Sequence, residues 1–314
     1  MNFRKIGLVN TNKMLVNAMN CGYAIGAFNV YNMETLSAVI NAARDTHSPI
    51  ILGISESALD YMGADMLMSM IRGSKIKPCE QIALHLDHGH SYESCVHAID
   101  IGFSSVMIDA SNLPFDENIA LSARVAKYAH RHNVSVETEL GALRGFEDEK
   151  TKSDIEQFTN PDDVATFVSE THTDSLAIAI GTSHGAYKRK SNNEKLQFDI
   201  LADIRRKIPK TPLVLHGASS IPTRIINKIN KNGGKISGAH GISPVQLRQA
   251  ISMGICKINV DSDNRLAFTA GVRTELYKHP NLFNPREYLD AAKSDVYNNT
   301  IDEIINIMNS ANRC

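Results

Sequence analysis

The stretch Ile82-Ala-Leu-His-Leu-Asp-His-Gly-His90 decides the fold, because an apolar run of strand length ends abruptly in residues that can do chemistry. The same pattern recurs in residues 176–185, 213–219 and 255–261. Three of these four stretches carry a histidine where the strand should stop. If the strands are parallel neighbours, their carboxyl ends meet at one edge of the sheet, and side chains far apart in the sequence converge there.

Apolar runs of this kind alternate with segments of helical periodicity along the chain. Short, continuous, branched apolar strands between helices are typical of a parallel sheet that is covered on its outer face. Eight such units predict a closed (β/α)8 TIM barrel. The expected strands are residues 24–30, 50–54, 82–87, 104–109, 134–140, 175–180, 212–215 and 255–260. A doubly wound open sheet is the alternative, but it usually carries a Gly-x-Gly-x-x-Gly turn after the first strand, which this sequence lacks.

We expect one domain over residues 1–314, with extra helices at its C-terminus near 285–293 and 295–310. Residues 141–153 and 231–241 carry glycine and charge without periodicity, so we expect a mobile loop at each place.

The composition excludes several classes of protein. Lys and Arg number 33 against 34 Asp and Glu, for a net charge of −1, so no basic field favours nucleic acid. No apolar run approaches the roughly 20 residues that cross a bilayer, and the N-terminal residues lack the apolar core of a signal peptide. Five scattered cysteines without a Cys-x-x-Cys pair favour reduced thiols in the cytoplasm.

Three histidines at strand ends predict a metal site. Any one of them alone would more often be a hydrogen-bonded loop or core residue. Three at matching positions favour catalytic zinc, which takes three protein ligands and keeps a fourth position open for substrate. The predicted ligands are His88, His184 and His216. We interpret the neighbouring His85 and His90 as structural.

Carboxylates end other strands of the predicted barrel. Asp109 and Glu139 could form a second metal position, or they could orient the histidine ligands from behind, and the sequence favours neither. Asp87 directly precedes a proposed ligand, where a carboxyl group suits proton transfer. Its alternative role is to cap the next helix.

Small residues with accessible backbone N–H groups follow the later strands and predict a phosphate cradle near helix N-termini. The candidate residues are Gly185, Gly217, Ala218, Ser219, Asn259, Val260, Asp261 and Ser262. Lys188 and Arg265 could supply positive charge, although Lys188 lies in a basic run that is more often a solvated surface.

Taken together, these motifs resemble the class II, zinc-dependent fructose-1,6-bisphosphate aldolases. The segments that carry the resemblance are Leu84-His-Leu-Asp-His-Gly89, Gly181-Thr-Ser-His-Gly-Ala-Tyr-Lys188, His216-Gly-Ala-Ser219, Lys257-Ile-Asn-Val-Asp261, Gly26-Ala-Phe-Asn-Val30 and Glu137-Thr-Glu-Leu-Gly141. The resemblance spans about residues 23–273 and implies the same barrel fold.

The resemblance also implies roles for individual residues. The three histidines would bind zinc, Asp109 and Glu139 would match a second metal position, and Asp87 would be the proton donor. Glu147 would match the base that exchanges a proton with the enediolate, although Arg144-Gly-Phe-Glu-Asp148 departs from the expected glycine pair. A monovalent cation, Na⁺ or K⁺, is commonly bound near the dihydroxyacetone-phosphate site. Family members are usually homodimers or homotetramers, with Arg265 expected near an interface.

The implied activity is reversible cleavage of fructose 1,6-bisphosphate to dihydroxyacetone phosphate and glyceraldehyde 3-phosphate. Tagatose-1,6-bisphosphate aldolase is the alternative within the family, and the residues from Asn259 to Arg265 look like the fructose type. A zinc-dependent barrel hydrolase would usually carry His-x-His on the first strand, where this chain has Ala27-Phe-Asn29. An intact Asp87 argues against a third possibility, a phosphosugar-binding protein without catalysis.

Overall fold

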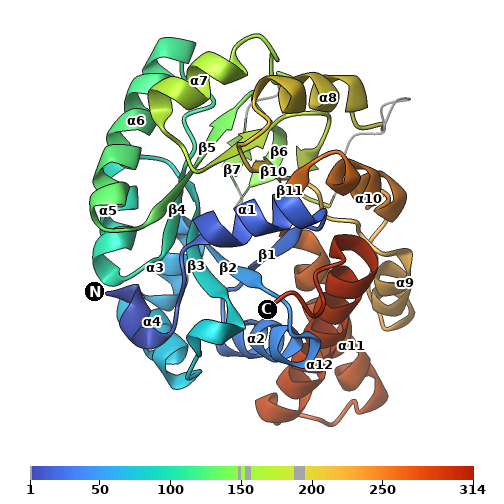
Figure 1. The fold of residues 1–314 in the computed structure, drawn as a ribbon. Helices are drawn as coiled ribbons and strands as arrows, with labels where there is room; N and C mark the ends of the chain where they lie inside the picture. The colour runs from blue at the N-terminus through green and yellow to red at the C-terminus, as the bar shows by residue number, and fades with distance from the viewer. Residues whose placement is uncertain (1, 148–149, 153–156, 187–194) are drawn as a thin grey trace.

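The computed structural model describes residues 2–147, 150–152, 157–186 and 195–314. Eight strands close into a barrel in the order β1-β11-β10-β8-β5-β4-β3-β2, and every neighbouring pair is parallel. The strands are β1 (Ile25–Asn29), β2 (Ile50–Ser55), β3 (Ile82–Gly89), β4 (Ser105–Ile108), β5 (Ser135–Leu140), β8 (Ser175–Ile178), β10 (Leu213–Leu215) and β11 (Ile255–Val260). The predicted (β/α)8 barrel is therefore confirmed (Figure 1).

Helices surround the barrel and lie between successive strands (Figure 1). They are α1 (Thr11–Cys21), α2 (Met33–Thr46), α3 (Glu56–Met62), α4 (Ala64–Gly73), α5 (Tyr92–Ile101), α6 (Phe115–Arg131), α7 (Val164–Thr171), α8 (Phe198–Lys207), α9 (Thr223–Lys231), α10 (Pro244–Ser252), α11 (Ser262–Lys278) and α12 (Pro285–Glu303). Asn32 caps the N-terminus of α2, because its side chain accepts a hydrogen bond from the Thr35 backbone N–H at 2.8 Å. In the described part of the chain, no helix combines the length and the apolar character that crossing a membrane requires.

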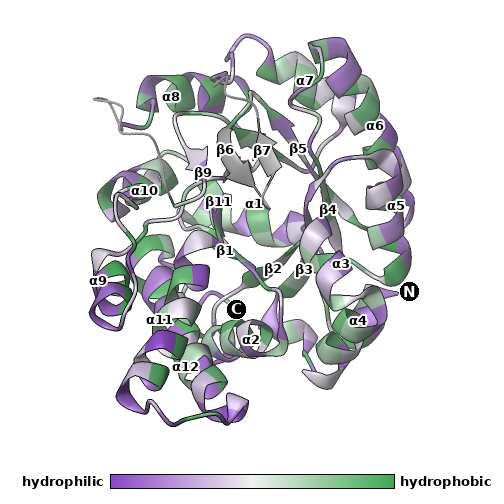
Figure 2. Cartoon of the chain, turned by 180° about the vertical axis from the view of Figure 1, so that it is seen from behind, coloured by the Kyte–Doolittle hydropathy of each residue, from purple (hydrophilic) through white to green (hydrophobic). Residues whose placement is uncertain are grey.

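The core lies between the barrel and its helices. The barrel strands are buried on both faces along their whole length, which is why they read as continuous apolar runs. Figure 2 shows that the surrounding helices carry both hydrophobic and hydrophilic segments, as expected when one side packs on the sheet and the other meets water.

Helix α1 was not anticipated from the sequence. Its first residue, Thr11, places its hydroxyl 2.7 Å from that of Ser135 and 3.3 Å from that of Ser105, both near the amino ends of their strands. The helix therefore covers the amino end of the barrel, and the carboxyl ends of the strands remain for a functional site.

The structure adds short strands to one expected loop and differs from one expectation about the C-terminal helices. Within residues 141–153, β6 (Arg144–Glu147) and β7 (Lys150–Lys152) form a short antiparallel pair, and β6 also pairs with β9 (Ser183–His184). Such short strands carry no periodicity that a sequence could show. The two expected C-terminal helices are one continuous helix, α12, followed by a π-helical turn, Ile304–Met308, because residues 293–295 contain no glycine or proline to interrupt it.

Candidate active site

A cavity of about 410 Å³ opens at the carboxyl ends of the barrel strands. Its walls come from β1, β2, β3, β9, β11, the loop after β10 and the start of α11. The lining residues are Asn29, Ser55, Asp87, His88, Ser183, His184, Gly185, Ala186, His216, Gly217, Ser219, Asn259, Asp261, Ser262, Arg265 and Leu266.

The three predicted histidine ligands converge in this cavity. The ring centroids of His88 and His216 are 4.4 Å apart, those of His88 and His184 are 5.1 Å apart, and those of His184 and His216 are 6.4 Å apart. Residues separated by up to 128 positions in the sequence (216 − 88) therefore face one another, as the strand-end pattern predicted.

A backbone irregularity in β3 lets consecutive residues reach the same cavity. The pairing of β3 with β4 shifts register between Leu86 and Gly89, and His88 lies in the left-handed region with a φ of 49°. An extended strand would send Asp87 and His88 to opposite faces, whereas a bulge changes the direction of one side chain. A left-handed conformation costs a non-glycine residue about 1–2 kcal/mol, so this strain is stored at the functional site.

Gly217 brings two ligand-bearing segments into contact. It has a φ of 60°, and a Cβ atom there would lie 2.7 Å from the carbonyl carbon of Ser183. Only glycine allows the segment after His216 to press so closely on β9, which carries His184.

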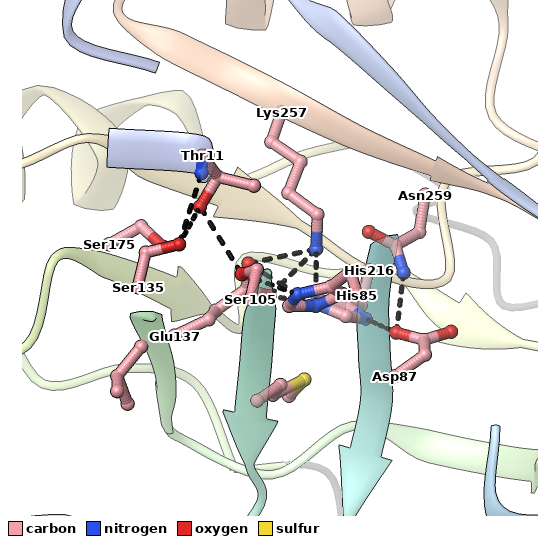
Figure 3. Close-up of polar contacts among 12 residues, drawn as sticks. Thr11, His85, Asp87, Ser105, Ser135, Glu137, Ser175, His216, Lys257 and Asn259 are labelled. Atoms are coloured by element: carbon pink, nitrogen blue, oxygen red, sulfur yellow. Dashed lines mark hydrogen bonds and ion pairs between the residues drawn. The ribbon is translucent and has the colours of Figure 1, made fainter. Parts of the chain in front are cut away.

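A buried ion pair orients His216 from below. Its Nε2 lies 2.7 Å from Oε1 of Glu137, whose two carboxylate oxygens accept from the Lys257 ammonium at 2.9 and 2.8 Å (Figure 3). Lys257 is fully buried and Glu137 is only 2% exposed. Because Glu137 accepts from Nε2–H, the Nδ1 atom of His216 keeps its lone pair towards the cavity.

His85 belongs to the same interior group. Its Nδ1 lies 2.8 Å from the Ser105 hydroxyl and its Nε2 lies 3.4 Å from the Lys257 ammonium (Figure 3). Burial lowers the pKa of both His85 and His216 well below the ordinary histidine value, and the charge of Lys257 lowers it further in each. Both imidazoles are therefore neutral.

Asp87 is held by two amides from neighbouring strand ends. Its Oδ2 accepts from Nδ2 of Asn29 at 2.8 Å, and its Oδ1 accepts from Nδ2 of Asn259 at 2.9 Å. The carboxyl is buried at the cavity wall, with Oδ1 3.9 Å from Nδ1 of His216.

The carboxylates of Asp109 and Glu139 lie beside the imidazole of His88. Oδ2 of Asp109 lies 3.1 Å from Nδ1 of His88, and Oε2 of Glu139 lies 3.7 Å from the same nitrogen. Among the residues that the structure describes, two groups could hold a metal by the mutual distances of their donor atoms. They are Asp87, His88 and His216, and separately His88, Asp109 and Glu139.

Among the described residues, the groups of close donor atoms include His88 and His216 but not His184, so only the ring separations link all three histidines to one tetrahedral ion. Zinc–nitrogen bonds of about 2.1 Å at tetrahedral angles would put imidazole centroids about 5 Å apart, and the three observed separations bracket that value. Nδ1 of His216 is buried without a hydrogen-bond partner among the described residues. An unpaired buried nitrogen is costly unless a ligand occupies its lone pair.

The remaining predicted residues fall into three groups. Most of the predicted phosphate cradle lines the cavity, namely Gly185, Gly217, Ser219, Asn259, Asp261, Ser262 and Arg265. Ala218 and Val260 are buried beside the cavity and are not among its described lining residues. Lys188 lies outside the described residues, and of Glu147 only the backbone is described, at the end of β6.

Sequence reasoning did not single out several described residues of the site, among them Asn29, Ser55, Glu137 and Lys257. Asn29 and Ser55 line the cavity, and each ends a barrel strand, so the strand-end criterion could have found them. Glu137 and Lys257 lie within their strands, where nothing in the sequence shows that they face each other across the barrel.

A parallel barrel with histidines and carboxylates converging at its carboxyl end is the architecture of a metal-dependent barrel enzyme. Residues 9–313 match the family model of class II fructose-bisphosphate aldolases. Fructose-bisphosphate aldolase of Treponema pallidum is 43% identical, with 99% of each chain covered. That of Giardia intestinalis is 44% identical over 95% of this chain and 92% of its own. The crystal structure of the YdjI aldolase from Escherichia coli K12 has a TM-score of 0.75 at 28% identity, covering 98% of this chain and 99% of that one.

The chain belongs to the class II fructose-bisphosphate aldolase family. It is therefore an aldolase, a carbon–carbon lyase of a metal-dependent family. The resemblance noted in the sequence is confirmed.

Proposed function

We propose that the chain cleaves fructose 1,6-bisphosphate reversibly to dihydroxyacetone phosphate and glyceraldehyde 3-phosphate, with zinc held by His88, His184 and His216. The observation that carries this proposal is the convergence of the three imidazoles beside the buried Asp87. Family membership supports the choice of substrate.

When bound, zinc supplies a Lewis acid that stabilises the negative charge developing beside the ketone as the carbon–carbon bond breaks. The protein residues position the substrate and move protons. Asp87 takes the proton of the C4 hydroxyl in cleavage and returns it in condensation. The two amide donors from Asn29 and Asn259 fix the orientation of this carboxyl, so that little reorganisation is needed during the reaction.

Glu147 is proposed to exchange the proton at the carbon of the product enediolate. The backbone of its strand β6 pairs with β9, at Gly145 opposite His184. This pairing brings the segment that carries Glu147 to the mouth of the barrel.

The cavity wall around Gly185, Gly217 and Ser219 and the N-terminus of α11 are proposed to hold the phosphate of the dihydroxyacetone-phosphate half. Lys188 and the remaining predicted cradle residues would complete this site. Arg265, whose Nε donates to Asp261 at 2.7 Å, is proposed to reach the distal phosphate. The phosphates supply binding energy that holds the scissile bond in place.

We propose that Asp109 and Glu139 form a second position for the metal, since both carboxylates lie near Nδ1 of His88. A monovalent cation, Na⁺ or K⁺, is proposed near the phosphate site. The enzyme would act in the cytoplasm, where its five cysteines, all free, would remain reduced. A homodimer or homotetramer is proposed, and light scattering would measure its mass.

Chelation tests the proposal. Incubation with EDTA should abolish cleavage of fructose 1,6-bisphosphate and Zn²⁺ should restore it, whereas borohydride with substrate should trap no adduct. Full activity in chelator would contradict the proposal, and so would a trapped lysine. A coupled assay on both sugar bisphosphates should give a lower kcat/KM for tagatose 1,6-bisphosphate than for fructose 1,6-bisphosphate. A higher value would reassign the substrate to the tagatose sugar.

Asp87→Ala tests the proton-transfer role. It should lose turnover by several orders of magnitude while zinc content stays near that of the wild type, because removing a positioned acid or base typically costs 10²–10⁴-fold in rate. Parallel loss of zinc and turnover would make Asp87 a structural residue instead.

A further inference from the structure

Two buried carboxyl groups lie behind the loop that lines the proposed phosphate site. Asp263, in the first turn of α11, is fully buried, and Glu303, the last residue of α12, is 3% exposed. The Ser220 hydroxyl lies 3.2 Å from a carboxyl oxygen of each residue, so the two carboxyl groups lie close together. None of the catalytic roles proposed above uses either residue.

Asp263 fixes the backbone of the loop after β10. Its Oδ2 accepts from the Ser220 N–H at 2.7 Å, and its Oδ1 accepts from the Ile221 N–H at 2.7 Å. Ile221 has a φ of 48°, which is strained for a branched side chain. The two charge-assisted hydrogen bonds hold this conformation in place.

Glu303 completes the arrangement from outside the barrel. Its Oε1 lies 3.2 Å from the Ser220 hydroxyl, which is itself 3.2 Å from Oδ2 of Asp263. Two carboxyl groups this close together and out of water are costly to ionise together, and burial followed by the charge of Asp263 raises the pKa of Glu303 well above its ordinary value. Asp263 accepts hydrogen bonds from two backbone N–H groups, which stabilise its ionised form. Glu303 is therefore the carboxyl group of the two that holds the proton.

Residues 241–242 also pack closely against the loop after β10, on the Ser219 side. A Cβ atom at Gly241 would lie 2.2 Å from the Ser219 carbonyl oxygen, and the Ile242 N–H donates to that same oxygen at 3.1 Å. Ser219 therefore has its backbone fixed by one neighbour, while Ser220 is fixed by the carboxyl pair. Ser219 and Ser262, the residue before Asp263, both line the cavity.

We propose that Glu303 is a positioning residue for the substrate phosphate, acting through Asp263 and Ser220 on the loop that carries Ser219 and on the first turn of α11, which carries Ser262. This inference rests on the proposed function, because it assigns that loop and that helix end to phosphate binding. It links a C-terminal helix outside the barrel to substrate affinity and leaves the reacting atoms untouched.

Three variants of the zinc-loaded, full-length enzyme test the proposal. Glu303→Leu removes the donor and should raise KM for fructose 1,6-bisphosphate about tenfold, the worth of one well-placed hydrogen bond, with kcat within about twofold. Glu303→Gln keeps an N–H donor for Asp263 and an oxygen for Ser220, so its KM should stay within about twofold of the wild type. Asp295→Leu is the matched control, because Asp295 ties α12 to Lys228 of α9 without touching the loops.

Calorimetric titration with dihydroxyacetone phosphate should show the same order of affinities, at unchanged zinc content. An equal rise in KM for Glu303→Leu and Asp295→Leu would overturn the proposal, as would a fall in kcat at constant KM. If Glu303→Leu does not fold, Ser220→Ala tests the proposal instead, because it removes the hydroxyl that contacts both carboxyl groups. An unchanged KM for Ser220→Ala would overturn the proposal. Failure of the wild type to cleave the bisphosphate would refute the proposed function, a result distinct from all of these.

Discussion

Glu137 and Glu303 are both buried carboxyl groups, but Glu137 lies beside a positive charge and Glu303 lies beside a second carboxyl group. Glu137 lies on the barrel interior and forms an ion pair with the Lys257 ammonium, 2.8 Å away. Glu303 lies outside the barrel beside Asp263, and burial followed by the charge of Asp263 raises its pKa well above the ordinary value. The difference follows position: below His216 a carboxylate accepts from the imidazole, whereas behind the phosphate loop two carboxyl groups face the same Ser220 hydroxyl.

The comparison shows that burial alone does not predict the charge of an acidic residue. A buried ion pair gains little net stability, since both charges lose water, but breaking it leaves one charge uncompensated. A shared proton avoids that penalty and makes the arrangement sensitive to pH. The two sites should therefore respond differently to substitution.

Lys257→Met should have the largest effect. It strands the Glu137 carboxylate in the barrel interior, which should lower the free energy of unfolding by about 3–5 kcal/mol in urea titrations. Adding Glu137→Gln to the same chain should recover much of the loss, because the uncompensated charge is then gone. If Lys257→Met alone lowers the free energy of unfolding by less than about 1 kcal/mol, water must reach the Glu137 carboxylate.

Glu137→Gln alone leaves the Lys257 ammonium uncompensated and should, in addition, weaken metal binding. It removes the anion that accepts from Nε2–H of His216, and loss of such a supporting partner typically costs 10–100-fold in metal affinity. Competition with a chromophoric chelator measures this directly, without an activity assay. Unchanged zinc affinity would show that the imidazole orientation is set by packing.

The smallest effect should appear in the pH dependence of stability. Burial raises the pKa of Glu303 well above the ordinary value of about 4.3, and repulsion from Asp263 adds to the shift. The native state therefore keeps a proton that the unfolded chain releases. This contribution to stability is fully present below about pH 4.3 and is lost as the pH rises towards the folded pKa.

Glu303→Gln should flatten this part of the curve. The difference in unfolding free energy between variant and wild type, at saturating zinc, should shift in favour of the variant from pH 5 to pH 8. Because both proteins carry the same histidine ligands, the pH dependence of metal binding cancels in the difference. Parallel curves would mean that Glu303 is ionised in the native protein.

The barrel and the three histidines could be predicted from the sequence because both follow from one local rule, an apolar run ending in a polar group. Asn29 obeys the same rule and was overlooked. The pairs Glu137–Lys257 and Asp263–Glu303 could not be found in this way, since they join residues 120 and 40 positions apart. Their partners depend on the register and closure of the barrel and on the packing of α12 against α11, which no local pattern encodes.

The close approach of Gly217 to Ser183 has a consequence for how this enzyme can change. The two chain segments that deliver His184 and His216 have no room between their backbones, so neither can shift without displacing the other. A side chain introduced at 217 would disturb two ligands at once. Evolution can therefore vary the outer rim of this pocket residue by residue, but it must alter these two loops together or leave both alone.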